Sequence, residues 1–519
     1  MLPIRRNLFS NRVISKASAA SNNHHASGRG LSPRAFSTKQ TKDEKSDDPP
    51  KQSETESSSS PQEADLPLTF ADISRAQVAI RGGIKKTYCE FSPFLSEQIG
   101  ANLYLKPEFR QFTGSFKERG ARNAILQLLT TKPSKVKGVI AASAGNHAQA
   151  LAYHGKLLGV PATVVMPTRA PLSKVDRCRV RSVTTRTIMD RPMDFILLEI
   201  PILDKRIPRY SPYTMPLVFF QIFGARVILH GNHIGEAKEF AESLVEKEGL
   251  DYVNGYDDPP ILAGAGTIGI EIMDDVPDVD VVVCPIGGAG LIAGIACAIK
   301  TLKPSVQVIG VEPAFCASYT AALKAGKPVT APFTPTLADG LAVPQVGPHA
   351  FQVARHYVDE CVLSSEKCIA LAVLRLLENE RIVVEGGGAA GLAGLLPGGP
   401  LDRPDIKGKN VVVPLCGGNI DTTVLGRVIE RGLAADERLV HFYATVSDRP
   451  GGIQGLCTVL AEEGASIKDI MHERAWLYSH VDQVKVRCVV ELHGKDHGTK
   501  LRERLLREGY PISWGIGLE

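Results

Sequence analysis

Between residues 66 and 435, short apolar runs alternate with segments of helical periodicity, and this alternation restricts the folds that the chain can adopt. Each run is rich in β-branched residues and stops at Gly, Pro or Ser. Such runs are typical of buried strands in parallel sheets, whose two faces are covered by helices. They occupy residues 135–142, 162–167, 225–231, 279–288, 306–313 and 410–418. The pattern predicts an α/β fold with parallel or mixed sheets between helices.

This α/β region, placed at residues 67–435, is too long for one hydrophobic core, because cores stop growing at about 250–300 residues. We therefore expect two subdomains with a cleft between them, the smaller spanning residues 110–228. From residue 437 to 519 the pattern changes to alternating strands and amphipathic helices. This second pattern predicts a separate small α+β domain with the element order βαββαβ.

The first 66 residues differ from the rest in composition. Residues 1–40 hold seven Lys and Arg, many Ser and no acid, which is typical of a mitochondrial transit peptide. We therefore expect a mitochondrial matrix protein, with a basic tail and a cytoplasmic location as the alternative. Residues 41–66 are polar and acidic with few apolar groups, which predicts a disordered linker.

Composition narrows the functional classes. The net charge is only +4, which gives no general argument for nucleic acid as a partner. No run of about 18 apolar residues lacks a charge, so no membrane-spanning helix is expected. The ten cysteines form no C-x-x-C pair, which disfavours a zinc ribbon or a disulfide scaffold.

Three Gly-rich turns follow predicted strands, at residues 143–147, 287–291 and 416–419. Such a turn leaves free N–H groups at a helix N-terminus, where phosphate or carboxylate binds well. Together the turns predict an anionic cofactor or substrate. The pattern of Gly288, Gly290 and Gly294, with Glu312 ending the next strand, is also similar to a dinucleotide fingerprint. A nicotinamide-dependent oxidoreductase is therefore an alternative.

The segment 113–121 places Lys117 beside small residues at the start of an apolar helix. A lysine is unexpected in a tight, partly buried turn, because removing an ammonium from water is costly. Burial lowers the pKa of the amine and makes it a better nucleophile, as a Schiff base requires. The alternative is a surface lysine paired with Glu118.

Five motifs in sequence, SFKERGA, SAGNHAQA, GGAGL, VEGGGAAGLA and CGGN, resemble those of the fold type II pyridoxal-phosphate enzymes. Among these, the chain is most similar to the threonine (serine) dehydratases, from about Ile80 to Gly432. The later stretch VSDRPGGIQGL resembles an ACT domain, so residues 437–519 are expected to be ACT-like. The resemblance implies pyridoxal 5′-phosphate as the cofactor.

The resemblance also implies catalytic and substrate-binding residues. Lys117 would form the Schiff base with the cofactor and then remove the substrate α-proton, with Ser115 close to the same amine. The backbone N–H groups of the 143–147 turn would bind the substrate carboxylate. The residues of this turn are Ser143, Ala144, Gly145, Asn146 and His147.

Further contacts to the cofactor are implied in the same way. Asn146 would bind the 3′-oxygen of the ring, and Glu385 would line the face of the ring, with Gly340 in the matching ADG turn. Cys416 stands where relatives usually have serine beside the ring nitrogen. A thiol cannot keep that nitrogen protonated as a carboxylate would, which favours β-elimination over transamination. The phosphate would bind backbone N–H groups of Gly287, Gly288, Ala289, Gly290 and Leu291.

The implied reaction is the deamination of L-threonine to 2-oxobutyrate and ammonia, and of L-serine to pyruvate and ammonia. Racemases of the family have a serine at the position of Ala144, and alanine has no proton to exchange. A serine racemase is therefore a less favoured alternative. No metal is expected, because Glu312 matches the racemase metal site but Ser318 replaces its aspartate.

Residues 180–221 form a segment that the family does not have, with no Gly and no Ala. Both ends can be encoded by splice-site sequences, so we interpret the segment as an in-frame retained intron. A lineage-specific surface loop is the alternative. If the segment impairs folding, the chain would be a catalytically impaired product that only binds an effector.

The ACT-like domain has two interpretations. In the first, it binds a small effector in the turn 448–452, where we expect free backbone N–H groups; the effector is an amino acid, with a nucleotide as the less favoured alternative. Alternatively, it serves only for assembly of the protein. We expect a homo-oligomer, either a dimer or a tetramer.

Overall fold

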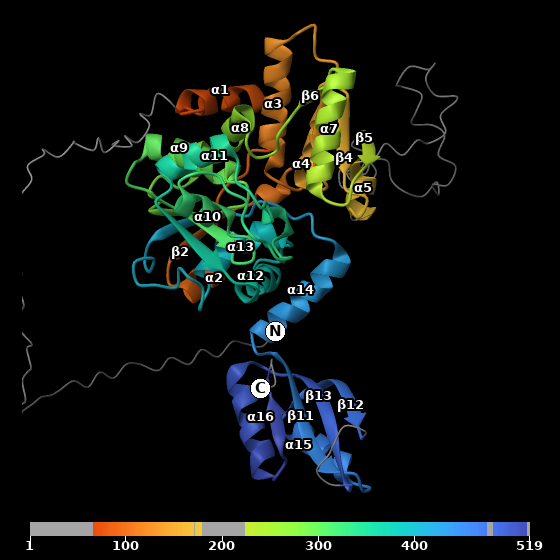
Figure 1. Cartoon of the computed structure of the whole chain (residues 1–519). Coiled ribbons are helices and arrows are strands. Elements are labelled where there is room, and N and C mark those ends of the chain that lie inside the picture. The colour runs from red at the N-terminus through yellow and green to blue at the C-terminus, as the bar shows by residue number, and fades with distance from the viewer. Residues whose placement is uncertain (1–65, 171, 179–223, 475–480, 516–519) are drawn as a thin grey trace, which may run out of the picture. The chain divides into compact units, whose positions relative to one another are not determined.

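The computed structural model describes residues 66–170, 172–178, 224–474 and 481–515 (Figure 1). The predicted transit peptide, nearly all of the predicted linker and the predicted insert lie outside these residues. None of the described helices combines the length and the apolar composition of a membrane span.

The larger sheet has six strands in the order β1-β2-β10-β7-β8-β9. All neighbouring strands are parallel except β1, which runs antiparallel to β2. Every residue of β7 is buried, as expected for a strand covered on both faces. The strands are β1 Glu90–Phe91, β2 Asn102–Lys106, β7 Val281–Pro285, β8 Gln307–Pro313, β9 Glu360–Ser364 and β10 Asn410–Pro414.

Two helical layers cover this sheet (Figure 1). Val282 and Cys284 of β7 pack with α1, α8, α9 and α11, whereas Val281 and Val283 pack with α2, α12 and α13. Successive residues of one strand thus point into opposite cores. The helices of this part are α1 Phe70–Ile80, α2 Pro93–Ile99, α8 Pro259–Asp275, α9 Gly290–Leu302, α10 Ser318–Ala325, α11 Pro348–Tyr357, α12 Glu366–Asn379, α13 Gly386–Leu395 and α14 Thr422–Ala435, with the short 3-10 turns η2 Glu108–Arg110 and η4 Asp339–Leu341.

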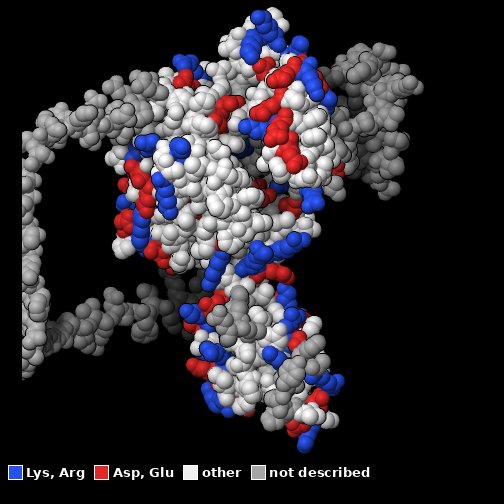
Figure 2. All heavy atoms as spheres, in the orientation of Figure 1, with Lys and Arg blue, Asp and Glu red and all other residues white. Residues whose placement is uncertain are grey.

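The smaller sheet has four parallel strands in the order β5-β4-β3-β6. Helices α3, α4 and α5 pack on one face and α7 on the other, and α7 shows acidic and basic groups side by side on its outer surface (Figure 2). The smaller subdomain extends past residue 228, because β6 pairs with β3. The elements are β3 Val139–Ala142, β4 Ala162–Met166, β5 Arg226–Leu229, β6 Asp251–Tyr252, α3 Lys117–Thr131, α4 Asn146–Leu157, α5 Leu172–Cys178 and α7 Ile234–Glu248.

The C-terminal part has the predicted element order βαββαβ. Its antiparallel sheet has the order β12-β13-β11-β14, and one face packs against α15 and α16 through residues such as Phe442, Leu456 and Leu501. The elements are β11 Leu439–Ser447, α15 Gly452–Glu462, β12 Ser466–Glu473, β13 Gln483–Glu491, α16 Lys495–Arg507 and β14 Ile512–Trp514.

All six strands predicted from apolar runs in the α/β region are present, and the α/β prediction is confirmed. The prediction missed β1, β2, β6 and β9. β1 and β6 have only two residues each, β2 alternates polar and apolar residues, and β9 is a partly exposed edge strand. None of these four has the continuous apolar run by which the others were recognised.

A buried cluster of ion pairs joins α3 to the larger sheet and to α8. Arg119, which is fully buried, donates from Nε to Glu108 at 2.8 Å and from Nη1 to Glu271 at 2.8 Å. The buried ammonium of Lys106 lies 2.9 Å from Glu271 and 3.1 Å from Asp275. Burial alone would raise the pKa of Glu271, but its bonds to Arg119 and Lys106 outweigh burial and lower it. Each charge in the cluster therefore depends on the others.

We expect Arg119→Met to destabilise the protein by about 3–5 kcal/mol, because it leaves two carboxylates buried without their partner. Urea unfolding followed by circular dichroism measures the change. Arg226→Ala, which removes the exposed pair with Glu248, is the matched control and should cost about 1 kcal/mol or less. Equal effects of the two substitutions would contradict the importance of the cluster.

Candidate active site

The carboxyl ends of strands from both sheets face one another, and two of the predicted turns meet there. β3 ends at Ala142 in the smaller sheet, and β10 ends at Pro414 in the larger one. The turns that follow are joined directly, because Asn419 Nδ2 donates to Asn146 Oδ1 at 2.8 Å. Ligands of α/β proteins bind at this edge of the sheet.

Lys117 is the first residue of α3 and is partly buried. Its Nζ donates a hydrogen bond to the carbonyl oxygen of Gly255. Burial lowers the pKa of Lys117 to about 8, although the nearby carboxylate of Glu385 opposes this. The amine is therefore more often unprotonated near neutral pH than an exposed lysine, which suits a nucleophile or a base.

The alternative pairing of Lys117 with Glu118 is not found. Glu118 is fully buried, accepts a hydrogen bond from the backbone N–H of Thr113, and lies 3.2 Å from His154 Nε2. The carboxylate of Glu118 thus fixes the turn before Lys117 and does not neutralise the amine.

Glu385 precedes α13 and contacts the turn that follows β3 in the smaller sheet. Asn146 Nδ2 donates to Glu385 Oε1 at 2.6 Å. Burial raises the pKa of Glu385 to about 7, the charge of Asp339 adds to this, and the Asn146 hydrogen bond and Lys174 oppose it. Near neutral pH this carboxyl group is therefore present in both protonation states.

The turn after β3 offers fewer free N–H groups than expected. Ser143 N donates to Val165 O at 3.0 Å as part of the sheet, and Gly145 N donates to Ser143 Oγ at 3.3 Å. The prediction that all five amides are available is wrong for these two residues. The amides without a hydrogen bond in the described chain are those of Ala144, Asn146 and His147.

The turn after β7 is an uncapped helix start. Ala289 has φ 70°, α9 begins at Gly290, and no side chain caps the helix. Among the described residues, no hydrogen bond occupies the N–H groups of the five residues 287–291. A Cβ on Gly290 would lie 2.1 Å from the carbonyl oxygen of Tyr256, so only glycine allows this close approach. The five amides and the positive helix end suit a phosphate.

Cys416 and Ser115 lie beside Lys117. Phe116 N donates to Cys416 O at 3.0 Å, which fixes the segment before the lysine to the turn after β10. Burial raises the pKa of Cys416, so its group is a neutral thiol. Ser115 is fully buried, and its Oγ has no hydrogen-bond partner in the described chain.

These residues fit pyridoxal phosphate. A partly buried amine of lowered pKa can react with an aldehyde, and the free amides of 287–291 can hold a dianionic phosphate. A neutral thiol can meet the ring nitrogen. A buried hydroxyl without a partner, such as that of Ser115, is costly and indicates a bound polar group at this place.

The dinucleotide interpretation requires a free acid at the end of β8, but Glu312 is not free. It is fully buried and accepts hydrogen bonds from Tyr319 N at 2.6 Å and from Thr320 N at 2.8 Å. Glu312 thus holds the start of α10 and cannot reach a ribose. In the described ranges there is no group of three metal-ligating residues.

Sequence reasoning gave no role to several residues of this site. Asn419 ends the CGGN motif and holds Asn146, and its position after a Gly-rich turn could have indicated it. Gly255 has no motif of its own. Lys174 of α5 lies 2.9 Å from Asp339 in η4, and this ion pair joins the smaller subdomain to the turn beside Glu385.

Comparison with known proteins defines the class. The family of pyridoxal-phosphate dependent enzymes matches residues 80–188 and 217–417, and the chain belongs to this family. The unmatched residues between the two ranges lie inside the predicted insert.

Individual relatives narrow the resemblance further. The chain is 38% identical to an L-threonine ammonia-lyase of Thermotoga maritima over 445 residues, which cover 86% of this chain and 99% of that protein. This match is longer than the predicted catalytic region, so it reaches into the C-terminal domain. A catabolic L-threonine dehydratase of Staphylococcus aureus is 38% identical over 372 residues, 70% of this chain and 93% of that protein.

Solved structures agree in fold. A processed threonine deaminase from Solanum lycopersicum has a TM-score of 0.58 and 32% identity, and covers 70% of this chain and 93% of its own. A serine racemase of maize has the same TM-score at 27% identity, over 71% of this chain and 98% of its own.

We expect Gly290→Ala to weaken binding of pyridoxal phosphate by about 10-fold or more, because the added Cβ displaces the turn and its charge-assisted hydrogen bonds. Titration of cofactor-free protein, followed by absorbance, measures this affinity. Gly426→Ala in α14 is the matched control, since a Cβ there meets open space. If both variants bind the cofactor like the parent, the phosphate site lies elsewhere.

Glu385→Gln should change how stability depends on pH. Because the folded protein raises the pKa of Glu385 to about 7, the parent protein loses stability as pH rises from 4.5 towards 7. Glutamine keeps the acceptor for Asn146 but does not ionise. The stability of the variant relative to the parent should therefore rise by about 3 kcal/mol between pH 4.5 and 8. Urea unfolding of cofactor-free protein tests this, and a constant difference would contradict it.

Proposed function

We propose that the chain is a pyridoxal-phosphate dependent ammonia-lyase that converts L-threonine to 2-oxobutyrate and ammonia. The observation that carries the proposal is the amine of Lys117, of lowered pKa, among three Gly-rich turns, two of them with unoccupied N–H groups. The relatives named threonine ammonia-lyase or dehydratase support this substrate, and one of them matches over nearly its whole length.

Each residue of the site has its own role in the proposed reaction. When bound, the cofactor supplies an aldehyde for amines and a ring that draws electrons from the substrate α-carbon. Lys117 accepts the α-proton at Nζ, and the carbonyl oxygen of Gly255 stabilises the ammonium that forms. The N–H groups of Ala144, Asn146 and His147 hold the substrate carboxylate at the start of α4. The neutral thiol of Cys416 would face the ring nitrogen and, unlike a carboxylate, would not keep it protonated, which favours elimination over transamination.

L-Serine is proposed as a second substrate, giving pyruvate and ammonia. It lacks only one methyl group of threonine, and a pocket distinguishes one methyl group by about 1–3 kcal/mol. Racemisation is not proposed, although racemases share the fold. Ala144 carries no hydroxyl that could deliver a proton to the face opposite Lys117.

For the C-terminal domain we propose an ACT-like role in binding a small amino-acid effector. The turn 448–452 is less open than the sequence suggested, because Asp448 N donates to Asp482 O at 2.8 Å and Gly452 N to Arg449 O at 3.1 Å. Arg449 N also donates to Ser447 Oγ at 3.3 Å and Pro450 has no N–H, so within this turn of the described chain the N–H group of Gly451 is left for a ligand.

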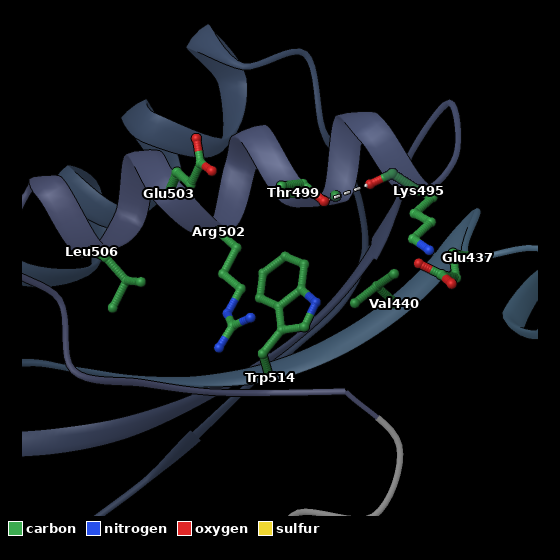
Figure 3. A pocket seen from close by; sticks show the side chains of 9 residues that line it. Glu437, Val440, Lys495, Thr499, Arg502, Glu503, Leu506 and Trp514 are labelled. Carbon is green, nitrogen blue, oxygen red and sulfur yellow. Dashed lines mark hydrogen bonds between the residues drawn. The ribbon is translucent and has the colours of Figure 1, made fainter. Parts of the chain in front are cut away.

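Besides this turn, a hollow of about 300 Å³ lies between α16, β11 and β14, beside Trp514, Arg502 and Lys495, and is another place where a small ligand fits (Figure 3).

Equilibrium dialysis with candidate amino acids tests binding to this domain. If no saturable binding is found, assembly of a dimer or tetramer is left as the role of the domain.

Two proposals concern the residues outside the described ranges. We propose that residues 1–40 direct the protein to the mitochondrial matrix, which a fluorescent fusion with and without them tests. We also propose that residues 180–221 are a retained intron, and sequencing of spliced transcripts tests this. If every spliced message contains these codons, the segment is a genuine loop.

Release of 2-oxobutyrate from L-threonine tests the function. We expect activity from the chain, or from the chain lacking 180–221 if the insert impairs it, and a loss of at least about 10³-fold in Lys117→Ala. Borohydride reduction followed by peptide mass should place the cofactor on Lys117. Chiral chromatography should detect no D-allo-threonine from L-threonine and no D-serine from L-serine. Bound cofactor with no 2-oxobutyrate from either chain would overturn the assignment of threonine.

A further inference from the structure

His147 is a buried side chain beside Lys117 whose ring has no role in the mechanism above. Only 6% of the residue is exposed, and it is the second residue of α4. Its Nε2 lies 3.0 Å from the carbonyl oxygen of Val253, which can only accept a hydrogen bond. Nε2 therefore carries the proton, and Nδ1 of the neutral ring is an acceptor, buried and without a partner.

The ring is neutral, and this suits its place beside an ammonium. Burial lowers the pKa of His147 to about 4, and the charge of Lys117 adds to the effect. A charged imidazolium would repel the Lys117 amine. The other titratable groups that face this amine are Glu385, before α13, and Cys416, after β10.

The ring also packs against the residue that binds the amine. A Cβ on Gly255 would lie 2.5 Å from Cγ and 2.7 Å from Cδ2 of His147, so the ring and the backbone of Gly255 are in close contact. Gly255 is also the residue whose carbonyl oxygen accepts from Lys117 Nζ. Through Val253 and Gly255, the His147 ring therefore touches both ends of the short segment that receives the amine.

The rest of this segment is held by its own bonds. Val253 N donates to Ile140 O at 2.9 Å, and Asn254 N donates to Asp258 Oδ2 at 2.7 Å. These bonds fix the strand side and the helix side of the segment. Between these two bonds, the ring of His147 in α4 packs against Gly255 and bonds to Val253.

We propose that His147 is a positioning residue for Lys117: its ring holds the 253–255 segment so that the carbonyl oxygen of Gly255 receives the protonated amine. The carbonyl stabilises the ammonium whenever Lys117 is not bound to the cofactor. The inference rests on the part of the proposed function that assigns Lys117 to the cofactor, and it does not depend on threonine as substrate.

The test follows the capture of pyridoxal phosphate by cofactor-free protein as a function of pH. Only the unprotonated amine reacts, so the midpoint of the capture rate reports the protonation of Lys117. His147→Phe keeps a ring but loses the donor to Val253. With the carbonyl displaced, the ammonium loses an acceptor, and the midpoint should move to lower pH by about one unit. His147→Gln, whose amide can donate to Val253, should restore the midpoint of the parent.

Two further variants keep the result interpretable if His147→Phe does not fold. Gly255→Ala pushes against the ring and should move the midpoint in the same direction. In a His147→Ala background the same change meets only the Cβ of residue 147, at 3.0 Å, and should move the midpoint less. His154→Gln, at another buried histidine of α4, is the matched control. The glutamine amide keeps a donor for Glu118, so the turn before Lys117 stays held and the midpoint should not move. An unchanged midpoint in both His147→Phe and Gly255→Ala overturns the proposal.

Borohydride trapping separates this proposal from the proposed function. If the parent protein traps cofactor on Lys117 but neither it nor the chain lacking 180–221 releases 2-oxobutyrate, the assigned substrate is wrong and the midpoints still decide the role of His147. If cofactor is trapped on another lysine, both assignments fail together.

Discussion

The buried ion pairs around Arg119 are the interaction on which the site depends. Arg119 lies two residues after Lys117 in α3, and its guanidinium is held by Glu108 of η2 and Glu271 of α8. Because breaking one pair leaves a buried charge unpaired, the start of α3 cannot shift relative to the larger sheet at low cost. The position of the Lys117 amine is therefore set by charges on the far side of its own helix.

Within the site, burial favours the neutral form of each titratable group. It lowers the pKa of Lys117 and His147 and raises that of Glu385 and Cys416, so each group is closer to its neutral form than it would be in water. The anionic groups of a cofactor and a substrate are left to the N–H groups and dipoles of helix starts, which need no counter-charge. A site of this kind can gain and lose a proton at Lys117 with little electrostatic penalty.

The sequence alone predicted the strands with continuous apolar runs, the turns that follow them, and the lysine in its tight turn. The sequence did not predict which backbone N–H groups are already used in hydrogen bonds within the protein. The N–H groups of Ser143 and Asp448 were expected to be free, but each donates to a carbonyl group in another segment. It also placed the end of the smaller subdomain too early, because β6 has two residues and is recognisable only by its pairing with β3.

By itself, the sequence determined which chemistry is available: an amine beside small residues, uncapped helix starts after Gly-rich turns, and an alanine where a second proton donor would be needed. Tertiary structure alone decided which groups meet. Lys117 contacts Gly255, which is 138 positions away in the sequence, and Asn146 contacts Glu385, which is 239 positions away. The first contact depends on how α3 packs on the smaller sheet, and the second on how the turn after β3 meets the start of α13. No local pattern of residue types encodes either packing.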